Sequence, residues 1–199
     1  MLRARIAVLV SGGGTNLQAL IDAERNGALP HGEIALAVSD RADAYALTRA
    51  GNAGVEALYI PGGAEFEKEL AAVLAQRDID MIILAGFLRI LSGAFTALWP
   101  RRIINIHPSL IPQFCGAGFY GLRVHEAALA AGVEYTGATV HYVNEIPDGG
   151  EIIAQKRVRV EPGDTPELLQ KRVMERAEWL LLPAAAESVA ERIVKETEL

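Results

Sequence analysis

The sequence predicts an α/β fold: an open, mostly parallel, twisted sheet with helices on both faces and an antiparallel pair of strands late in the chain. Short, wholly apolar runs recur along the first half, as in strands that are buried on both faces. Segments with apolar residues at helical spacing separate these runs, which is the alternation expected of βαβ units. Two late strand-like segments, joined by a modest loop, indicate the antiparallel pair.

Composition limits the class of protein. The chain has 199 residues, of which 51% are hydrophobic and 22% charged, so we expect a single globular domain over residues 1–199. A formal net charge of −6 argues against a nucleic-acid partner. No apolar run approaches the length of a membrane span, and the first residues lead into a strand without a cleavage-site pattern. We therefore expect a cytoplasmic protein.

The first predicted strand is Ile6–Val10, and a glycine-rich turn at Ser11–Asn16 separates it from a helix that carries Leu17, Leu20 and Ile21. Glycines let a backbone approach a ligand closely, and the helix N-terminus offers free N–H groups. No Lys follows the last glycine, so this is not a P-loop, and Leu17 replaces the third glycine of a dinucleotide fingerprint. We expect a phosphate monoester here; a tight turn without a ligand is the alternative.

The remaining elements follow in order. Strands are expected at 34–38, 55–60, 81–85, 103–107, 136–143 and 151–160, with helices around 45–51, 66–74, 95–99, 124–129 and from 164 onward. Ser92 is the predicted N-cap of the short fourth helix, and Pro183 predicts a break or kink in the last helical region. Asp40 follows the second strand, where dinucleotide enzymes keep a ribose-binding carboxylate, but the incomplete glycine pattern makes that interpretation weak.

Asn105 and His107 lie two residues apart in a predicted strand and therefore share a face. Pro108 cannot donate to a strand ladder, so the strand ends there and leaves His107 at its carboxyl edge, where open α/β sheets bind ligands. An amide can donate to a developing oxyanion, and an imidazole can move a proton. A strand-end amide and a core histidine with backbone partners remain the alternative.

Two further segments flank this pair. Asp148 precedes two glycines in the loop between the late strands, from which a carboxylate can approach His107 and raise its pKa. An Asp chosen for turn geometry is the alternative. The loop Gly86–Ser92 is apolar except for Arg89, and it could form a hydrophobic slot with one cation. A core loop with a solvated arginine is the alternative there.

Two other kinds of chemistry are weakly supported. The single cysteine, Cys115, lies near His107 in sequence, but no third, orienting residue is evident, so covalent catalysis is not expected. A metal site made of His107, His125, His141 and Asp148 is conceivable, yet no tight ligand spacing appears.

Five segments, in order, resemble the folate-dependent formyltransferase family. They are Ser11–Asn16, Leu84–Ser92, Asn105–Pro112, Thr136–Val143 and Asp148–Gly150, and they keep the family's spacing from residue 5 to about residue 183. The resemblance implies a Rossmann-like formyltransferase fold without a metal. It also implies transfer of the formyl group of 10-formyltetrahydrofolate to the primary amine of glycinamide ribonucleotide, a step of purine (IMP) synthesis.

The resemblance also implies roles for individual residues. Asn105 and His107 would stabilise the oxyanion of a tetrahedral intermediate, while Asp148 would favour the imidazolium form of His107 and relay a proton. The residues expected to hold the ribonucleotide are Gly13, Gly14, Thr15, Asn16, Pro108 and Glu178. Those expected around the folate are Leu88, Arg89, Ile90, Leu91, Val143, Asn144 and Glu145, together with Asn105 and Asp148. The implied partners are these small molecules alone, for a monomer or a homodimer.

The chain departs from the family pattern in three places. The segment Cys115–Gly121 is longer than usual, Glu151 replaces a usual proline after Asp-Gly-Gly, and no second ribose contact aligns near Glu175. Formyltetrahydrofolate hydrolase, with an additional N-terminal domain, and methionyl-tRNA formyltransferase, with an extra C-terminal domain and a basic surface, are the rivals within the family. Outside it, a non-catalytic nucleotide-binding module would explain the glycine turn, but not Asn105, His107 and Asp148 together.

Overall fold

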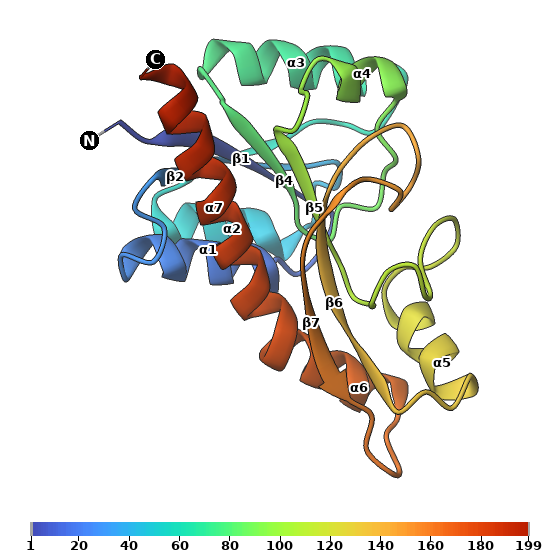
Figure 1. Ribbon diagram of the computed structural model, residues 1–199. Coiled ribbons are helices and arrows are strands. Elements are labelled where there is room, and N and C mark those ends of the chain that lie inside the picture. Colours follow the sequence, from blue (N-terminus) through green and yellow to red (C-terminus); the bar gives the residue numbers. More distant parts are fainter. Residues whose placement is uncertain (1, 199) are drawn as a thin grey trace.

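The computed structural model describes residues 2–198 and contains a seven-stranded sheet with helices on both faces (Figure 1). The strands are β1 (Ala4–Val10), β2 (Gly32–Ser39), β3 (Glu56–Tyr59), β4 (Met81–Leu84), β5 (Ile103–His107), β6 (Tyr135–Tyr142) and β7 (Ile152–Arg159). The helices are α1 (Thr15–Arg25), α2 (Tyr45–Ala53), α3 (Phe66–Gln76), α4 (Gly93–Ala97), α5 (Leu122–Ala130), α6 (Pro166–Val173) and α7 (Trp179–Thr197). Residues 1 and 199, the ends of the predicted domain, lie outside the described residues.

The strand order is β3-β2-β1-β4-β5-β6-β7. Strands β1 to β5 are parallel, β6 is antiparallel to β5, and β7 is antiparallel to β6. The predicted fold class is therefore confirmed, including the late antiparallel pair. The chain winds outward from β1 to β3 and then returns to β4 on the other side of β1. This reversal leaves a crevice at the carboxyl ends of β1 and β4, where such sheets bind ligands.

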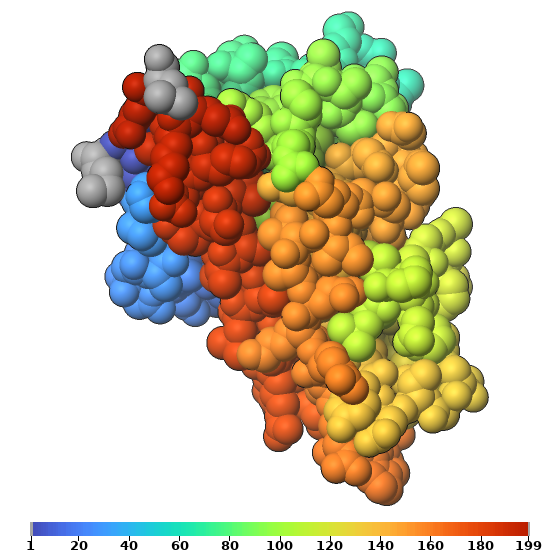
Figure 2. Space-filling model, in the orientation of Figure 1, coloured from blue at the N-terminus to red at the C-terminus, as the bar shows by residue number. Residues whose placement is uncertain are grey.

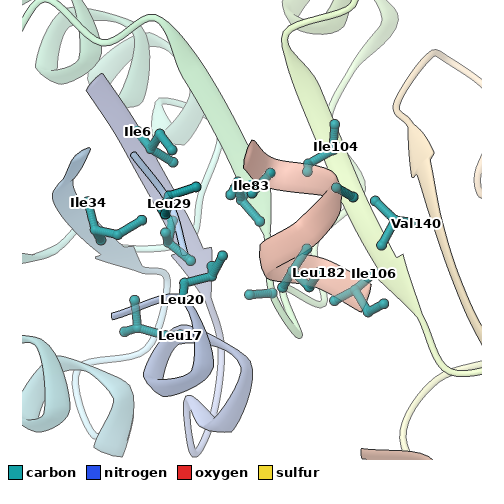
Figure 3. Close-up of a cluster of buried hydrophobic side chains, with 14 of the residues drawn as sticks. Ile6, Leu17, Leu20, Leu29, Ile34, Ile83, Ile104, Ile106, Val140 and Leu182 are labelled. Atoms are coloured by element: carbon teal, nitrogen blue, oxygen red, sulfur yellow. The ribbon is translucent and has the colours of Figure 1, made fainter. Parts of the chain in front are cut away.

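The core lies on both faces of the sheet. One buried cluster packs α1, α2, α6 and α7 against the sheet, and it includes Ile83 and Ile104 (Figure 3). The other packs α3 and α4 against the opposite face and includes Phe66 and Ile82. Because Ile82 and Ile83 are neighbours in β4, their side chains point to opposite faces and both are fully buried. Burial on both faces explains the wholly apolar runs in the sequence.

Helix ends follow local sequence signals. The Ser92 hydroxyl accepts a hydrogen bond from the amide of Phe95 at 3.1 Å, which confirms the predicted N-cap of α4. The Thr165 hydroxyl accepts from the amide of Leu168 at 3.3 Å at the start of α6, where Pro166 lies in the first turn.

The predicted break in the helix at Pro183 is wrong, because α7 continues through this residue. The irregular part lies earlier, in a π-helical turn at Met174–Glu178. A proline at position 183 removes only the hydrogen bond to the carbonyl of Trp179, the first residue of α7. Pro183 is also buried, so packing supports the helix at this point.

The last helix closes one side of the molecule. Helix α7, drawn in red, contacts α1 and runs beside the orange strand β7 (Figures 1 and 2). Of the helices in the described part of the chain, none is both long enough and apolar enough to cross a membrane.

Candidate active site

A cavity of about 600 Å³ lies at the carboxyl ends of β1, β4 and β5. Every residue predicted for the site lines it, with the exception of Glu145. The chain turns at Asn144, whose side chain accepts a hydrogen bond from the amide of Ile146, and Glu145 then faces Gly93 at the start of α4. The structure therefore brings together residues from six separate parts of the sequence, but not the Glu145 side chain.

Asp40, the candidate for a dinucleotide ribose, does not line the cavity. Its carboxylate accepts a hydrogen bond from the Ser11 hydroxyl at 2.7 Å, and the Ser11 oxygen accepts one from the amide of Leu88 at 3.0 Å. Asp40 thus joins the glycine loop to the loop after β4, which gives it a structural contact in place of a ribose contact.

Asn105 lies at the centre of a polar cluster. Its Nδ2 atom is 3.1 Å from Nε2 of His141 and 3.4 Å from Oδ1 of Asp148. His141 faces Asn105 directly across the β5–β6 ladder, and its Nδ1 atom donates to the carbonyl of Tyr142 at 2.8 Å. The antiparallel pairing of β6 therefore fixes the side chain that contacts Asn105.

His107 is buried, with 4% of its surface exposed. Its Nε2 atom donates to the carbonyl of Phe114 at 2.8 Å, and its Nδ1 atom lies 3.5 Å from Oδ2 of Asp148. Burial lowers the pKa of His107, and the nearby Asp148 carboxylate only partly opposes this effect. Asp148 thus raises the pKa of His107, as expected, but desolvation of the ring outweighs this effect, and the net pKa lies below its ordinary value.

Asp148 lies in a left-handed backbone conformation, with φ 54°. A side chain at Gly150 would meet the carbonyl oxygen of Tyr142 at 1.7 Å, so the glycine lets the loop pack closely against β6. Asp148 Oδ2 accepts a hydrogen bond from the amide of Gly116 at 2.8 Å. Burial raises the pKa of Asp148, but hydrogen bonding to His141, the charge on His107 and the Gly116 amide together lower it. The carboxyl group is therefore ionised at neutral pH.

The glycine loop forms the other end of the cavity. Gly14 is the N-cap of α1 and makes no side-chain cap, so the first amides of the helix have no side-chain partner. Asn16 donates from Nδ2 to Glu178 at 2.7 Å, while its buried Oδ1 atom has no partner. Burial raises the pKa of Glu178 to about 6, against the opposing effect of this hydrogen bond.

Apolar side chains gather at the remaining wall. Leu88 and Ile90 are 55% and 67% exposed, and both line the cavity. The Arg89 guanidinium lies 5.0 Å from the ring centre of Phe66 and is directed towards Gly62. This wall is therefore largely apolar, with a single cation beside it.

Sequence reasoning considered His125 and His141 only as metal ligands, and it missed the backbone groups beside the site. The contact of His141 with Asn105 could have been found from the register of the antiparallel pair, because the two residues face one another. Phe114 and Gly116 contribute backbone groups, and backbone contacts leave no signature in residue type. His125 lines the cavity with both ring nitrogens unpartnered, and burial lowers its pKa to about 4. Nothing in the sequence distinguishes it from an ordinary helix residue.

The two alternative chemistries gain no geometric support. Burial raises the pKa of the Cys115 thiol, and its Sγ atom lies near the carbonyl of Pro112 at 3.3 Å. A thiol in this state is a poor nucleophile. Among residues 2–198, no three His, Cys, Asp or Glu side chains are arranged to hold a metal ion. The expected absence of a metal nevertheless stays a prediction.

The glycine-rich loop and the cluster of Asn105, His107 and Asp148 line one cavity at the carboxyl edge of an α/β sheet, which is the arrangement of an enzyme active site. The model of the formyl transferase family matches residues 4–185, and the chain belongs to this family. Its relatives include a chloroplastic phosphoribosylglycinamide formyltransferase from Arabidopsis thaliana, which is 37% identical over 197 residues. That alignment covers 96% of this chain and 67% of the plant protein.

Two further relatives agree with this assignment. The trifunctional purine biosynthetic protein adenosine-3 of Gallus gallus is 43% identical over 97% of this chain, which spans 19% of the chicken protein. The crystal structure of glycinamide ribonucleotide transformylase 1 from Symbiobacterium toebii has a TM-score of 0.88 and 42% identity. The superposition covers 96% of this chain and 89% of the Symbiobacterium chain, so the two proteins share the fold.

Proposed function

We propose that this protein transfers the formyl group of 10-formyltetrahydrofolate to the primary amine of glycinamide ribonucleotide, in the synthesis of purines. The observation that carries the proposal is the single cavity in which a phosphate loop and the Asn105, His107 and Asp148 cluster face each other. The names of the similar proteins support the same substrate. Both substrates lie in one cavity, so proximity supplies a large part of the acceleration.

The acceptor occupies the end of the cavity at α1. The free amides of the glycine loop and the positive end of the α1 dipole favour a phosphate dianion. Beside them, the carboxyl of Glu178 and the unpartnered Oδ1 atom of Asn16 are hydrogen-bond acceptors, as ribose hydroxyls require. Pro108 closes this region next to the strand end of His107.

The formyl donor occupies the apolar wall. A family of formyl transferases implies a folate-derived donor, whose ring system supplies the activated formyl group when it is bound. The exposed side chains of Leu88 and Ile90 fit a flat aromatic ring, and Leu91 and Val143 extend the same wall. Arg89 lies at its edge, where it can pair with an anionic group of the donor.

Asn105 and His107 stabilise the negative charge that develops on the formyl oxygen. The contact from Asn105 Nδ2 to Asp148 is long at 3.4 Å, so this N–H group is available to a stronger acceptor. His107 lies next to this oxyanion, with Asp148 3.5 Å away to stabilise positive charge on its ring. As the amine nitrogen bonds to the formyl carbon, Asp148 takes the proton that the amine loses, through a water molecule. The same proton passes on to the folate nitrogen when its bond to the formyl carbon breaks, so that tetrahydrofolate leaves with that proton and the Asp148 carboxylate is restored.

Formyl transfer from 10-formyltetrahydrofolate, measured with and without glycinamide ribonucleotide, tests the proposal. We expect turnover only when the ribonucleotide is present, and a fall of about a hundred- to a thousand-fold in kcat for Asn105→Ala, because one oxyanion donor is lost. Asp148→Asn removes the charge without changing the shape and should lower kcat strongly as well. Asn52→Ala, on the exposed side of α2, is the matched control and should leave turnover unchanged.

The outcomes separate this proposal from its rivals. Turnover of the formyl folate at the same rate with and without the ribonucleotide would indicate formyltetrahydrofolate hydrolase. Formyl transfer to methionyl-tRNA would indicate methionyl-tRNA formyltransferase. Full activity in Asn105→Ala would remove the three-residue site from the mechanism. A cytoplasmic location and a monomeric or homodimeric state also stay predictions.

A further inference from the structure

The glycine loop is held from behind by α2. The amide of Ala46 donates to the carbonyl of Gly12 at 3.1 Å, and Nε of Arg49 donates to the carbonyl of Gly13 at 2.8 Å. A peptide unit is planar and trans, so its C=O and N–H groups point in opposite directions. Two carbonyls that turn towards α2 therefore turn the amides of Gly13 and Gly14 in the opposite direction. Both glycines line the cavity and no residue of α2 does, so we place the cavity on the side of the loop away from α2.

Arg49 is itself held in place by three neighbours. Its guanidinium lies 5.1 Å from the ring centre of Tyr45 and donates to the Gln18 side chain at 3.4 Å. Its Cδ atom packs beside Gly14, at 3.4 Å from the position of a Cβ on that glycine. Arg49 is partly buried as a result, and its side chain is fixed before any ligand arrives.

Among the described residues, no Lys or Arg side chain lines the cavity at this end. Arg89 is the only Arg or Lys among those that line it, and its guanidinium lies over Phe66, next to α3. The residues that line the cavity near the glycine loop are Gln170, Met174 and the acidic Glu178. A phosphate dianion bound here therefore depends on backbone amides, and the charge of Arg49 reaches it through one peptide unit. Hydrogen bonding to the carbonyl of that unit polarises it and strengthens its N–H donor.

We propose that Arg49 is a positioning residue for the acceptor's phosphate: it fixes the glycine loop with its amides towards the cavity and sets the affinity for a phosphorylated acceptor. This inference rests on the proposed function and adds a residue outside the cavity to the recognition of the substrate. Arg49 touches no reacting atom, so its effect belongs to binding.

The test compares two acceptors, glycinamide ribonucleotide and the same molecule without its phosphate, glycinamide riboside. For Arg49→Gln we expect kcat/KM for the ribonucleotide to fall about tenfold, mostly through KM, because one charge-assisted hydrogen bond is lost. For the riboside we expect a change of less than about twofold, since no phosphate is present. Arg49→Lys keeps the charge and one donor, and it should recover most of the loss.

Arg25→Gln is the matched control. Arg25 also donates to a backbone carbonyl, that of Ala53 at the end of α2, at 3.0 Å, but it lies at the far end of α1 from the glycine loop. Both acceptors should keep their wild-type kcat/KM in this variant.

The inference is overturned if Arg49→Gln lowers kcat/KM equally for both acceptors, because the residue then supports the fold alone. It is also overturned if neither value changes. Calorimetric binding of the ribonucleotide to the wild type and to Arg49→Gln decides the matter without turnover. A wild type that binds the ribonucleotide but does not formylate it would refute the proposed function, while the ratio of the two dissociation constants would still test Arg49.

Discussion

Glu178 illustrates how burial sets the charge of a single group in this site. Its side chain is 6% exposed, and its one hydrogen-bond donor is Asn16 Nδ2 at 2.7 Å. One donor does not replace the lost hydration of a carboxylate, so the pKa rises from its ordinary value of 4.5 to about 6. The protein holds a proton there that the unfolded chain has already released.

Glu178→Gln is therefore expected to change how stability depends on pH. Between 4.5 and about 6 the folded state binds more protons at this carboxyl than the unfolded state, so wild-type stability falls as pH rises through that window. The variant loses this slope. Relative to the wild type it should be about 2 kcal/mol more stable at about pH 7.5 than at about pH 4.

Urea unfolding of both proteins at the two pH values measures this difference. His125 contributes a slope of opposite sign, because its lowered pKa of about 4 favours the folded state as pH rises, but it is present in both proteins and cancels. An equal stability difference at both pH values would show that the Glu178 carboxyl is not desolvated in the folded protein.

At the scale of elements, α1 and α2 approach each other at Gly14. This residue has φ 74°, and a Cβ there would lie 2.6 Å from Cβ of Ala46. Gly14→Ala should therefore cost about 1 kcal/mol from backbone strain and about 1–3 kcal/mol more from overpacking. It should also raise KM for the ribonucleotide, because α2 would be pushed from the glycine loop. Thermal unfolding and steady-state kinetics give the two values.

Gly27→Ala is the control for strain alone. Gly27 has φ 81°, and a Cβ added there would have no atom within 4 Å, so the substitution should cost about 1 kcal/mol without a change in KM. Equal losses in the two variants would mean that the contact between α1 and α2 yields freely and does not hold the loop.

Elements with a local signal were predictable from the sequence. The end of β5 at His107, before Pro108, and the N-cap at Ser92 each depend on residues that are close together in the sequence. The break predicted at Pro183 within the last helical region is wrong, because the sequence does not show that this residue is buried beside a π-helical turn. Local signals thus fix where elements begin more reliably than where they continue.

The candidate site could be predicted only in part, for a related reason. Asn105, His107 and Asp148 have distinctive side chains next to strand ends or glycines, and the structure brings them together. The partners of His107 and Asp148 include a carbonyl and an amide from the loop at 114–116, and any residue type supplies those groups. The lowered pKa of His107 depends on burial by the whole fold, which no local pattern contains.

At the scale of the molecule, the two core clusters share one sheet. The single domain predicted over the chain therefore implies that both clusters unfold together. Ile82→Val and Ile83→Val remove the same group from neighbouring positions of β4, one from each face. Each should lower the free energy of unfolding by about 0.5–1.5 kcal/mol in a single transition. Denaturation followed by circular dichroism and by tryptophan fluorescence checks this, and separate transitions in the two probes would refute the single domain.

The hydrogen bond between Asn16 and Glu178 joins residues 162 positions apart. The sheet and the Asn105, His107 and Asp148 cluster are therefore complete in the sequence before Glu178 is reached. During translation, the glycine loop is made first and the carboxyl group beside it much later. A chain that stops before residue 178 lacks this carboxyl, and one wall of the cavity then ends at Asn16.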